Sequence, residues 1–295
     1  MSLSHQHTLV RPAFLEGLGI HTGRSVRVAI QPAPAHSGIR FLRTDLAGAS
    51  IAAHGGAVCE TRLGTVIGND RGVTVATIEH LMATLCALAI DNVVVELDGP
   101  EVPIMDGSCQ PFLTALDKAG RRQQDARRRY IEILDPIAVR DGDKRASLGP
   151  ASGFEVAFEI AFDDPAIGRQ RIDLAVEGSS FRDELADSRT FGFLHEVEAL
   201  RAAGLARGGS LDNAVVVENG AVLNPEGLRR PDEFVRHKAV DAIGDLYLLG
   251  APLIGRYEAI QGGHALNNAL VRAVLGDPRA WAYAFAPEAL ARAAG

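Results

Sequence analysis

Two short motifs in this sequence combine a histidine with a carboxylate at spacings that suit metal binding. His237 and Asp241 lie four positions apart in a segment with helical apolar spacing, so their side chains leave one face of a helix one turn apart. Glu79 and His80 are adjacent at the start of an earlier apolar segment, where a metal bound by His80 would have Glu79 beside it. Each motif alone is also typical of a surface pair, a first-turn acid or a buried core histidine.

A third histidine, His264, follows Gly262 and Gly263 at an expected helix start. Glycines let the backbone approach a ligand closely, and a histidine there can titrate near neutral pH. Three of these side chains, His80, His237 and Asp241, would leave a tetrahedral zinc ion with one open position for water, as in catalytic zinc sites. Because His80 lies in the first half of the chain and His237 and Asp241 lie in the second, we expect the zinc site in a cleft between two domains.

Helices and strands that could position these side chains are visible as periodic patterns. Apolar spacing predicts helices around residues 78–85, 234–249 and 266–274. Alternation of apolar with small or polar residues predicts strands, and Asn219-Gly220 is typical of a type I′ hairpin turn. The expected strands are residues 25–31, 38–43, 93–97, 130–134, 154–162 and 214–218.

The 295 residues and a hydrophobic fraction of 47% favour two domains. A charged stretch with little apolar content, residues 117–129, is interpreted as the linker, which divides the chain into domains 1–124 and 125–295. Both halves place strands first and a long helix later. This order predicts an α+β fold built from a duplicated unit.

Composition and charge exclude several classes of protein. The 30 basic and 37 acidic side chains give a net charge of −7, which argues against a nucleic-acid partner. The most apolar window, residues 81–90, is about half the length needed to cross a bilayer. Residues 1–7 lack the features of a secretory signal, and Cys59, Cys86 and Cys109 form no C-x-x-C pair. We therefore expect a cytoplasmic protein without a transmembrane segment or disulfides.

Seven longer motifs then follow one another along the chain: His21-Thr22-Gly23, residues 77–82, Ile90-Asp91-Asn92, and residues 103–108, 188–193, 234–246 and 263–268. Together they resemble the zinc-dependent UDP-3-O-acyl-N-acetylglucosamine deacetylase (LpxC) family of lipid A biosynthesis in Gram-negative bacteria. The resemblance implies two similar α+β domains, each a β-sheet layered with helices and carrying a small insert, with the active site at their interface. It also implies hydrolysis of the N-acetyl group, the committed step towards lipopolysaccharide.

The same resemblance implies roles for individual residues. One Zn²⁺ would be bound by His80, His237 and Asp241, with Glu79 as general base. His264 would be the protonated partner that stabilises the oxyanion and donates to the leaving amine, oriented by Asp245. Thr190 would hydrogen-bond the tetrahedral intermediate, while Lys238 and Lys144 would bind substrate. General chemistry supports this division of roles, because an amide nitrogen leaves poorly unless an acid protonates it.

An insert of the second domain is expected at about residues 190–217, where apolar side chains recur: Phe191, Phe193, Leu194, Val197, Leu200 and Leu205. A fatty acyl chain needs such a slot, since each methylene removed from water contributes about 0.8 kcal/mol. We place Phe191, Phe193 and Val197 on the acyl passage, with Leu63 added by the resemblance. A small local core is the alternative interpretation of these residues.

Departures from the family pattern occur near the first helix. Ala87 and Ala89 stand where the family commonly has glycines, so a left-handed helix end at Ala89 would cost up to roughly 1 to 2 kcal/mol. Cys109 replaces a residue that is usually small, and we interpret it as a packing thiol.

Two other functions remain open at this stage. One is a catalytically silent relative that binds nucleotide sugar or lipid, and the other is a metal amidase for a different N-acetyl sugar. Retention of every expected catalytic group argues against the first, and the apolar insert argues against the second. The partner expected is one small molecule, a UDP-linked acyl amino sugar, bound by a monomer.

Overall fold

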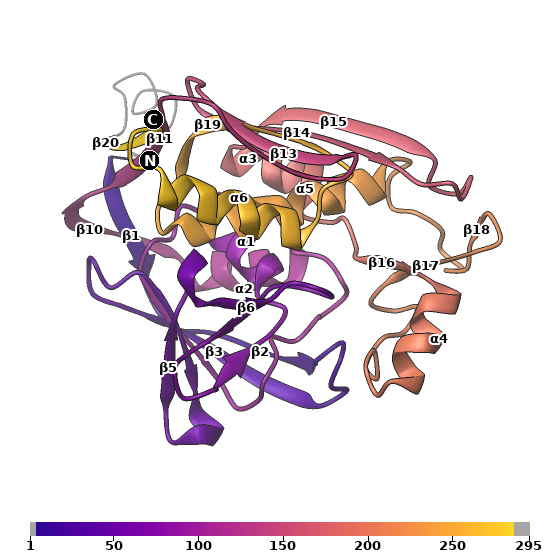
Figure 1. Cartoon of the computed structure of the whole chain (residues 1–295). Helices are drawn as coiled ribbons and strands as arrows, with labels where there is room; N and C mark the ends of the chain where they lie inside the picture. Colours follow the sequence, from indigo (N-terminus) through magenta and orange to yellow (C-terminus); the bar gives the residue numbers. More distant parts are fainter. Residues whose placement is uncertain (1–3, 286–295) are drawn as a thin grey trace.

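The computed structural model describes residues 4–285, which form two main β-sheets with helices between them and three smaller sheets (Figure 1). The main strands of the first half are β2 (Ala13–Leu18), β3 (Ser25–Pro32), β4 (Ile39–Arg43), β5 (Ala49–Ala52) and β9 (Val93–Leu97). Those of the second half are β12 (Ile137–Asp141), β13 (Lys144–Gly149), β14 (Phe154–Ala161), β15 (Arg169–Ala175) and β19 (Leu253–Ile260). The helices are α1 (Glu79–Ala87), α2 (Gln110–Ala119), α3 (Gly178–Ser180), α4 (Leu194–Ala202), α5 (Glu233–Leu246) and α6 (His264–Gly276).

One five-strand topology occurs twice along the chain. The first sheet has the order β2-β3-β9-β4-β5, in which β9 is antiparallel to β3 and parallel to β4. In the second sheet β12, β13, β19, β14 and β15 follow one another with the same directions, because β19 is antiparallel to β13 and parallel to β14. The predicted α+β class and the duplicated unit are thereby confirmed.

Four further strands lie outside these two five-strand units. β11 (Arg129–Ile133) and β20 (Trp281–Phe285) extend the second sheet, and β1 (His5–Leu9) pairs with β10 (Arg121–Arg127) in a separate ribbon. The stretch interpreted as a linker therefore contains a strand, and the expected boundary at residue 124 falls inside it. The charged residues of β10 made this segment look like an exposed linker. Arg128, which follows the strand, is instead buried in an ion pair of 2.7 Å with Asp91.

The helices of the two halves face one another between the sheets (Figure 1). α1 and α2 lie on the first sheet and α5 and α6 on the second, with α1 packed against α5. Gly244 on α5 allows this close approach, since a Cβ atom there would lie 2.0 Å from the Glu79 carbonyl oxygen. The start of α1 and the middle of α5, which carry the candidate ligands, are consequently brought together.

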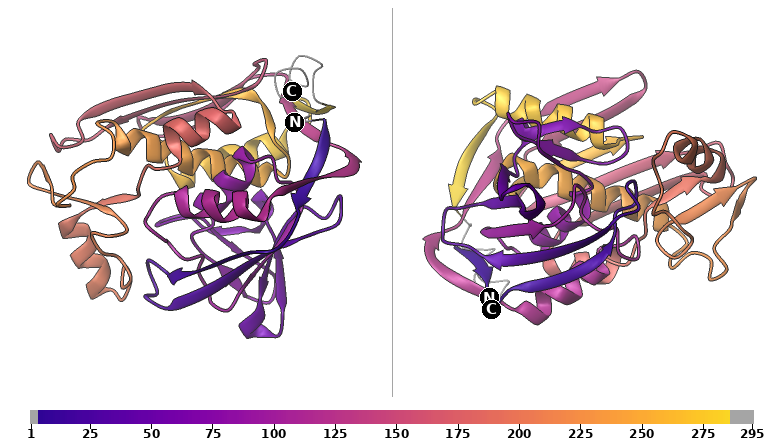
Figure 2. Two further views of the ribbon diagram at one scale, coloured as in Figure 1. Left: turned by 180° about the vertical axis from the view of Figure 1, so that it is seen from behind. Right: turned by 90° about the horizontal axis from the view of Figure 1, so that it is seen from below.

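A small three-stranded sheet accompanies each main sheet. The first consists of β6 (Val58–Glu60), β7 (Val66–Gly68) and β8 (Thr74–Val75), and the second of β16 (Phe191–Phe193), β17 (Val215–Glu218) and β18 (Ala221–Val222). We call residues 190–222, which contain α4, the acyl insert after the role predicted for this segment; it extends past the expected end at residue 217. Both views of Figure 2 show it projecting from one side of the molecule. Short helical turns complete the described residues: Thr44–Leu46, Gly55–Ala57, Phe181–Leu185 and Tyr247–Leu249.

Most of the predicted elements are confirmed with shifts of one or two residues. The hairpin at Asn219-Gly220 has positive φ at both residues, 50° and 79°, as a type I′ turn requires. Ala89 adopts a left-handed conformation with φ of 53°, although it is not glycine. A hydrogen bond of 2.9 Å from the Ile90 N–H to the Leu85 carbonyl closes this helix end, and burial of Ile90 offsets the strain.

Among residues 4–285, no helix is both long enough and apolar enough to cross a membrane. The free thiol of Cys109 is buried in the core, as expected for a packing residue. Its Sγ donates a weak hydrogen bond of 3.3 Å to the His80 carbonyl, so it also supports the backbone of α1.

Candidate metal-dependent active site

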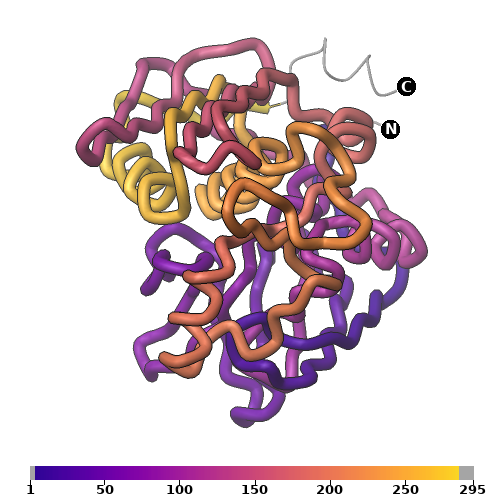
Figure 3. Tube along the Cα trace, turned by 90° about the vertical axis from the view of Figure 1, so that its right-hand side faces the viewer, coloured from indigo at the N-terminus to yellow at the C-terminus, as the bar shows by residue number. Residues whose placement is uncertain are grey.

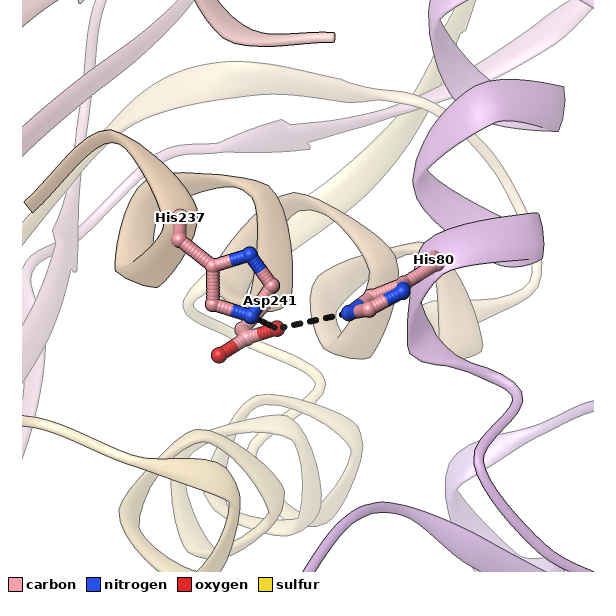
Figure 4. A group of neighbouring side chains, drawn as sticks. All are labelled: His80, His237 and Asp241. Carbon is pink, nitrogen blue, oxygen red and sulfur yellow. Dashed lines mark ion pairs between the residues drawn. The ribbon is translucent and has the colours of Figure 1, made fainter. Parts of the chain in front are cut away.

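His80 of α1 and His237 and Asp241 of α5 converge at one buried point (Figure 4). Their potential ligand atoms all lie within 4.8 Å of one another. The Asp241 Oδ1 atom is 3.3 Å from His237 Nε2 and 3.6 Å from His80 Nε2. This arrangement matches the three protein ligands of a catalytic zinc site.

The donor atoms themselves fit a metal ion. Within the described residues, Asp241 Oδ1 is buried and has no hydrogen-bond partner. His237 Nδ1 lies 3.1 Å from the Ser188 carbonyl, which can only accept, so Nδ1 carries a proton and Nε2 is the nitrogen that can bind a metal once the ring is neutral. Burial raises the pKa of Asp241, but His237 and Lys238 outweigh it and hold that pKa well below its usual range. The Asp241 carboxylate and the Nε2 atoms of His80 and His237 therefore converge on one position.

His264 stands beside this trio as a charged group. Its Nδ1 donates to Asp245 Oδ2 at 2.9 Å, and its Nε2 lies 3.9 Å from both Glu79 Oε1 and Asp241 Oδ2. Burial lowers the pKa of His264, but the charge and hydrogen bond of Asp245 raise it to about 10. His264 is consequently protonated at neutral pH and can donate a proton from Nε2 into the site.

Glu79 supplies a second buried carboxylate that is not among the converging ligands. Burial raises the pKa of Glu79, against the lowering effect of the His264 and His80 charges. Its Oε2 accepts a hydrogen bond of 3.0 Å from the Thr65 N–H, which fixes the carboxylate. A carboxylate with a raised pKa next to a metal position is suited to accept a proton from water.

These groups share a cavity of about 520 Å³ with the apolar residues of the acyl insert. The predicted residues that line it are Leu63, Glu79, His80, Thr190, Phe191, Phe193, Val197, His237, Lys238, Asp241 and His264. Asp245 lies behind His264 and acts on the cavity only through it. Lys144 lies outside the lining, exposed at the start of β13 in the β12–β13 hairpin.

A family model described as UDP-3-O-acyl N-acetylglycosamine deacetylase, LpxC, matches residues 6–276. The chain belongs to the LpxC family. Proteins named UDP-3-O-acyl-N-acetylglucosamine deacetylase are similar to it over nearly their whole length. The protein from Phenylobacterium zucineum is 64% identical, covering 98% of this chain and 99% of the relative. Those from Myxococcus xanthus and a serogroup C strain of Neisseria meningitidis are 52% and 48% identical, covering 93% and 94% of this chain and 87% and 92% of the relatives.

In this LpxC chain the acyl insert borders the cavity with a row of apolar side chains. Phe191 packs edge-on against Phe234 with ring centroids 4.9 Å apart, and Lys238 Nζ lies 5.6 Å from the Phe191 ring centroid. Leu194, Val197 and Leu200 of α4 also line the cavity, and no residue of α4 is buried. The apolar side of this helix thus faces a hollow and packs no core of its own.

Several residues that support this LpxC site were missed from the sequence. The Thr65 hydroxyl donates to Asp245 Oδ1 at 2.5 Å, and Asn267 Nδ2 donates to Asp245 Oδ2 at 2.9 Å. Tyr257 in turn donates to Asn267 Oδ1 at 2.6 Å. Asn267 could have been found, because it lies three residues after His264 on one helix face. Thr65 carried no signal, since its partner lies far along the chain.

Proposed function

We propose that this chain hydrolyses the acetamide of UDP-3-O-acyl-N-acetylglucosamine, releasing acetate and leaving the free amine of UDP-3-O-acyl-glucosamine. One observation carries the proposal: a single cavity contains both the groups needed for amide hydrolysis and an apolar slot. The family membership and the names of the relatives support the same substrate.

His80, His237 and Asp241 are proposed to hold one zinc ion. When bound, zinc supplies a Lewis acid that lowers the pKa of water towards about 7 and polarises a carbonyl. The buried, unpartnered Asp241 Oδ1 supports this assignment, because a buried carboxylate oxygen without a partner is costly.

The remaining residues divide the proton transfers between them. Glu79 takes a proton from the attacking water as its oxygen bonds to the acetyl carbon. Thr190 and the imidazolium of His264 stabilise the negative charge that develops on the carbonyl oxygen. His264 then protonates the sugar nitrogen as the C–N bond breaks, and Asp245 keeps its ring oriented and charged.

Substrate recognition is assigned to the outer part of the cavity. Phe191, Phe193, Val197 and Leu63 are proposed to contact the acyl chain, and Lys238 to contact the polar part of the substrate. Lys144 is kept as a proposed substrate contact, which requires the substrate to reach beyond the cavity to the β12–β13 hairpin. The monomeric state and the cytoplasmic location remain predictions.

The decisive experiment combines metal analysis with a deacetylation assay. The purified chain should contain one zinc ion and release acetate from UDP-3-O-acyl-N-acetylglucosamine, and chelation should abolish the activity until zinc is restored. His237→Ala should lose metal at limiting zinc, because only two ligands remain. Full zinc occupancy in that variant would refute the ligand assignment. Equal activity on an N-acetyl sugar without an acyl chain would favour the general amidase.

A further inference from the structure

Glu101 is a fully buried carboxylate that the proposed chemistry does not use. It lies at the end of the first main sheet, beside Ala76, with which it forms an isolated bridge. Its Oε1 accepts from the His21 N–H at 3.0 Å and from Thr77 Oγ1 at 3.2 Å. Its Oε2 accepts from Thr22 N and Oγ1 at 3.0 and 2.9 Å. Four donors therefore satisfy both oxygens of the buried side chain, and Glu101 connects two chain segments.

The first of these segments, residues 19–23, is a tight loop at the rim of the cavity. Gly19 is required there, because a Cβ atom at this position would lie 2.3 Å from Glu101 Oε2. The loop also contacts the connection between β6 and β7, since His21 Nε2 lies 3.3 Å from the Leu63 carbonyl. Glu101 thus holds the conformation of this loop, and the loop in turn contacts Leu63, which lines the cavity.

The acyl insert attaches to the same loop by its backbone. The Arg207 and Gly208 N–H groups donate to the His21 and Ile20 carbonyls at 3.3 and 3.0 Å. A Cβ atom at Gly208 would lie 2.3 Å from the Gly19 carbonyl oxygen, so only glycine permits this approach. Figure 3 shows the insert, in orange, crossing in front of the first half of the chain. We call this pair of hydrogen bonds the latch.

The second segment held by Glu101 leads into the catalytic helix. Thr77 has a left-handed backbone with φ of 58°, which is uncommon for a β-branched residue, and it lies two residues before Glu79. The side-chain hydrogen bond to Glu101 helps to hold this conformation. One carboxylate thus contacts both the loop that carries the latch and the start of α1.

We propose that Glu101 is a positioning residue that fixes the latch, and thereby makes deacetylation depend on the acyl chain of the substrate. When the latch is closed, α4 and its apolar side chains are held over the cavity, so the acyl chain has a formed slot to enter. When it is open, the insert keeps its connections to the second half of the chain and its contact with Gly107, where the Thr190 N–H donates to the Gly107 carbonyl at 2.8 Å. This inference rests on the proposed deacetylase function.

Substitution Glu101→Gln tests the carboxylate with little change in volume. In this variant the NH₂ group of the amide would face the backbone N–H of either Thr22 or His21. Two hydrogen-bond donors would then oppose each other, so the loop would have to shift. Gly208→Ala opens the latch from the opposite side without touching Glu101. Thr22→Val removes one of the four hydrogen bonds, and Thr22→Ser should restore it as the conservative rescue.

The readout is the ratio of kcat/KM for UDP-3-O-acyl-N-acetylglucosamine to that for UDP-N-acetylglucosamine, measured at equal zinc content. Glu101→Gln and Gly208→Ala should each lower this ratio roughly tenfold, which is the change expected when one hydrogen bond to a charged group is lost. Thr22→Val should lower it less, and Thr22→Ser should leave it near the wild-type value. A drop that is equal for both substrates would mean that Glu101 supports only the general fold, and would overturn the inference.

Amide hydrogen exchange provides a second readout that needs no substrate. The Arg207 and Gly208 amides should exchange faster in Glu101→Gln than in wild type, and should stay protected in Gly209→Ala, where an added Cβ meets nothing closer than 3.4 Å. Unchanged exchange in folded Glu101→Gln would refute the latch. A wild-type enzyme without activity on the acyl substrate would instead refute the proposed function, while exchange would still decide whether Glu101 holds the latch.

Discussion

His7 predicts a loss of stability in mildly acidic solution that is separate from catalysis. This side chain is 2% exposed, and its Nδ1 has no hydrogen-bond partner among the described residues. Its backbone is held firmly, since its N–H donates to Asp91 Oδ2 at 2.8 Å and its carbonyl accepts from the Asp91 N–H at 2.9 Å. Burial and then the charges of Arg121 and Arg128 lower the pKa of His7 from 6.5 to about 4.

The direction of the effect follows from where the proton binds. Below pH 6.5 the unfolded chain protonates His7, whereas the folded chain does so only near pH 4, so the unfolded state is stabilised relative to the folded state as the pH falls. The full stabilising contribution of neutral His7 is therefore present above pH 6.5 and is lost between there and pH 4. Between pH 7.5 and pH 5 the lowered pKa corresponds to a loss of about 2 kcal/mol in the free energy of unfolding.

Chemical denaturation of the zinc-saturated protein at pH 7.5 and pH 5 measures this loss. Other groups and the metal also titrate, so the useful quantity is the difference between wild type and His7→Leu, in which nothing titrates at this position. Wild type should lose about 2 kcal/mol more than the variant. His54→Gln, a change at an exposed histidine, should behave like wild type. Equal losses in wild type and His7→Leu would show that His7 is not responsible.

Three further predictions concern the site. Glu79→Ala should keep its zinc and lose about 10² to 10⁴ in kcat/KM, the usual contribution of a positioned proton-transfer group, and wild-type activity would remove Glu79 from the mechanism. The pH profile of kcat/KM should be bell-shaped, and Asp245→Asn should move its basic limb to lower pH because Asp245 raises the pKa of His264; an unmoved limb would contradict this. Val197→Asp should reduce kcat/KM far more for the acylated than for the non-acylated substrate, since only the acyl chain desolvates the new carboxylate; equal losses would assign Val197 to the fold.

The chemistry of the site could be anticipated from the sequence because its residues sit on short helical motifs. His237 and Asp241 are related by helix geometry alone, and Glu79 and His80 by adjacency. What joins these motifs is the packing of α1 on α5, which depends on Gly244 and on side chains far apart in sequence. The periodicity of a single helix contains no information about its partner, so the convergence was inferred from the donor chemistry of the motifs and then from the family resemblance.

The missed features are those made by backbone atoms or by distant polar pairs. β10 was hidden because its residues are mostly charged or polar and pair with β1 through main-chain groups. Glu101 carries no visible pattern, since its donors are two backbone amides and two hydroxyls from other segments. Ala89 was judged unfavourable in a left-handed conformation, yet the surrounding packing imposes it.

The convergence of ligands from α1 and α5 has a consequence for assembly of the protein. Neither half of the chain contains a complete chelating set, so each half alone would bind zinc weakly and the folded pair would bind it tightly. By mass action, an ion that binds only the assembled form adds about 2.7 kcal/mol to its stability at a hundredfold excess over Kd. The ion would therefore act as a removable crosslink between the two halves that share one strand topology, and metal supply would affect the stability of the molecule as well as its chemistry.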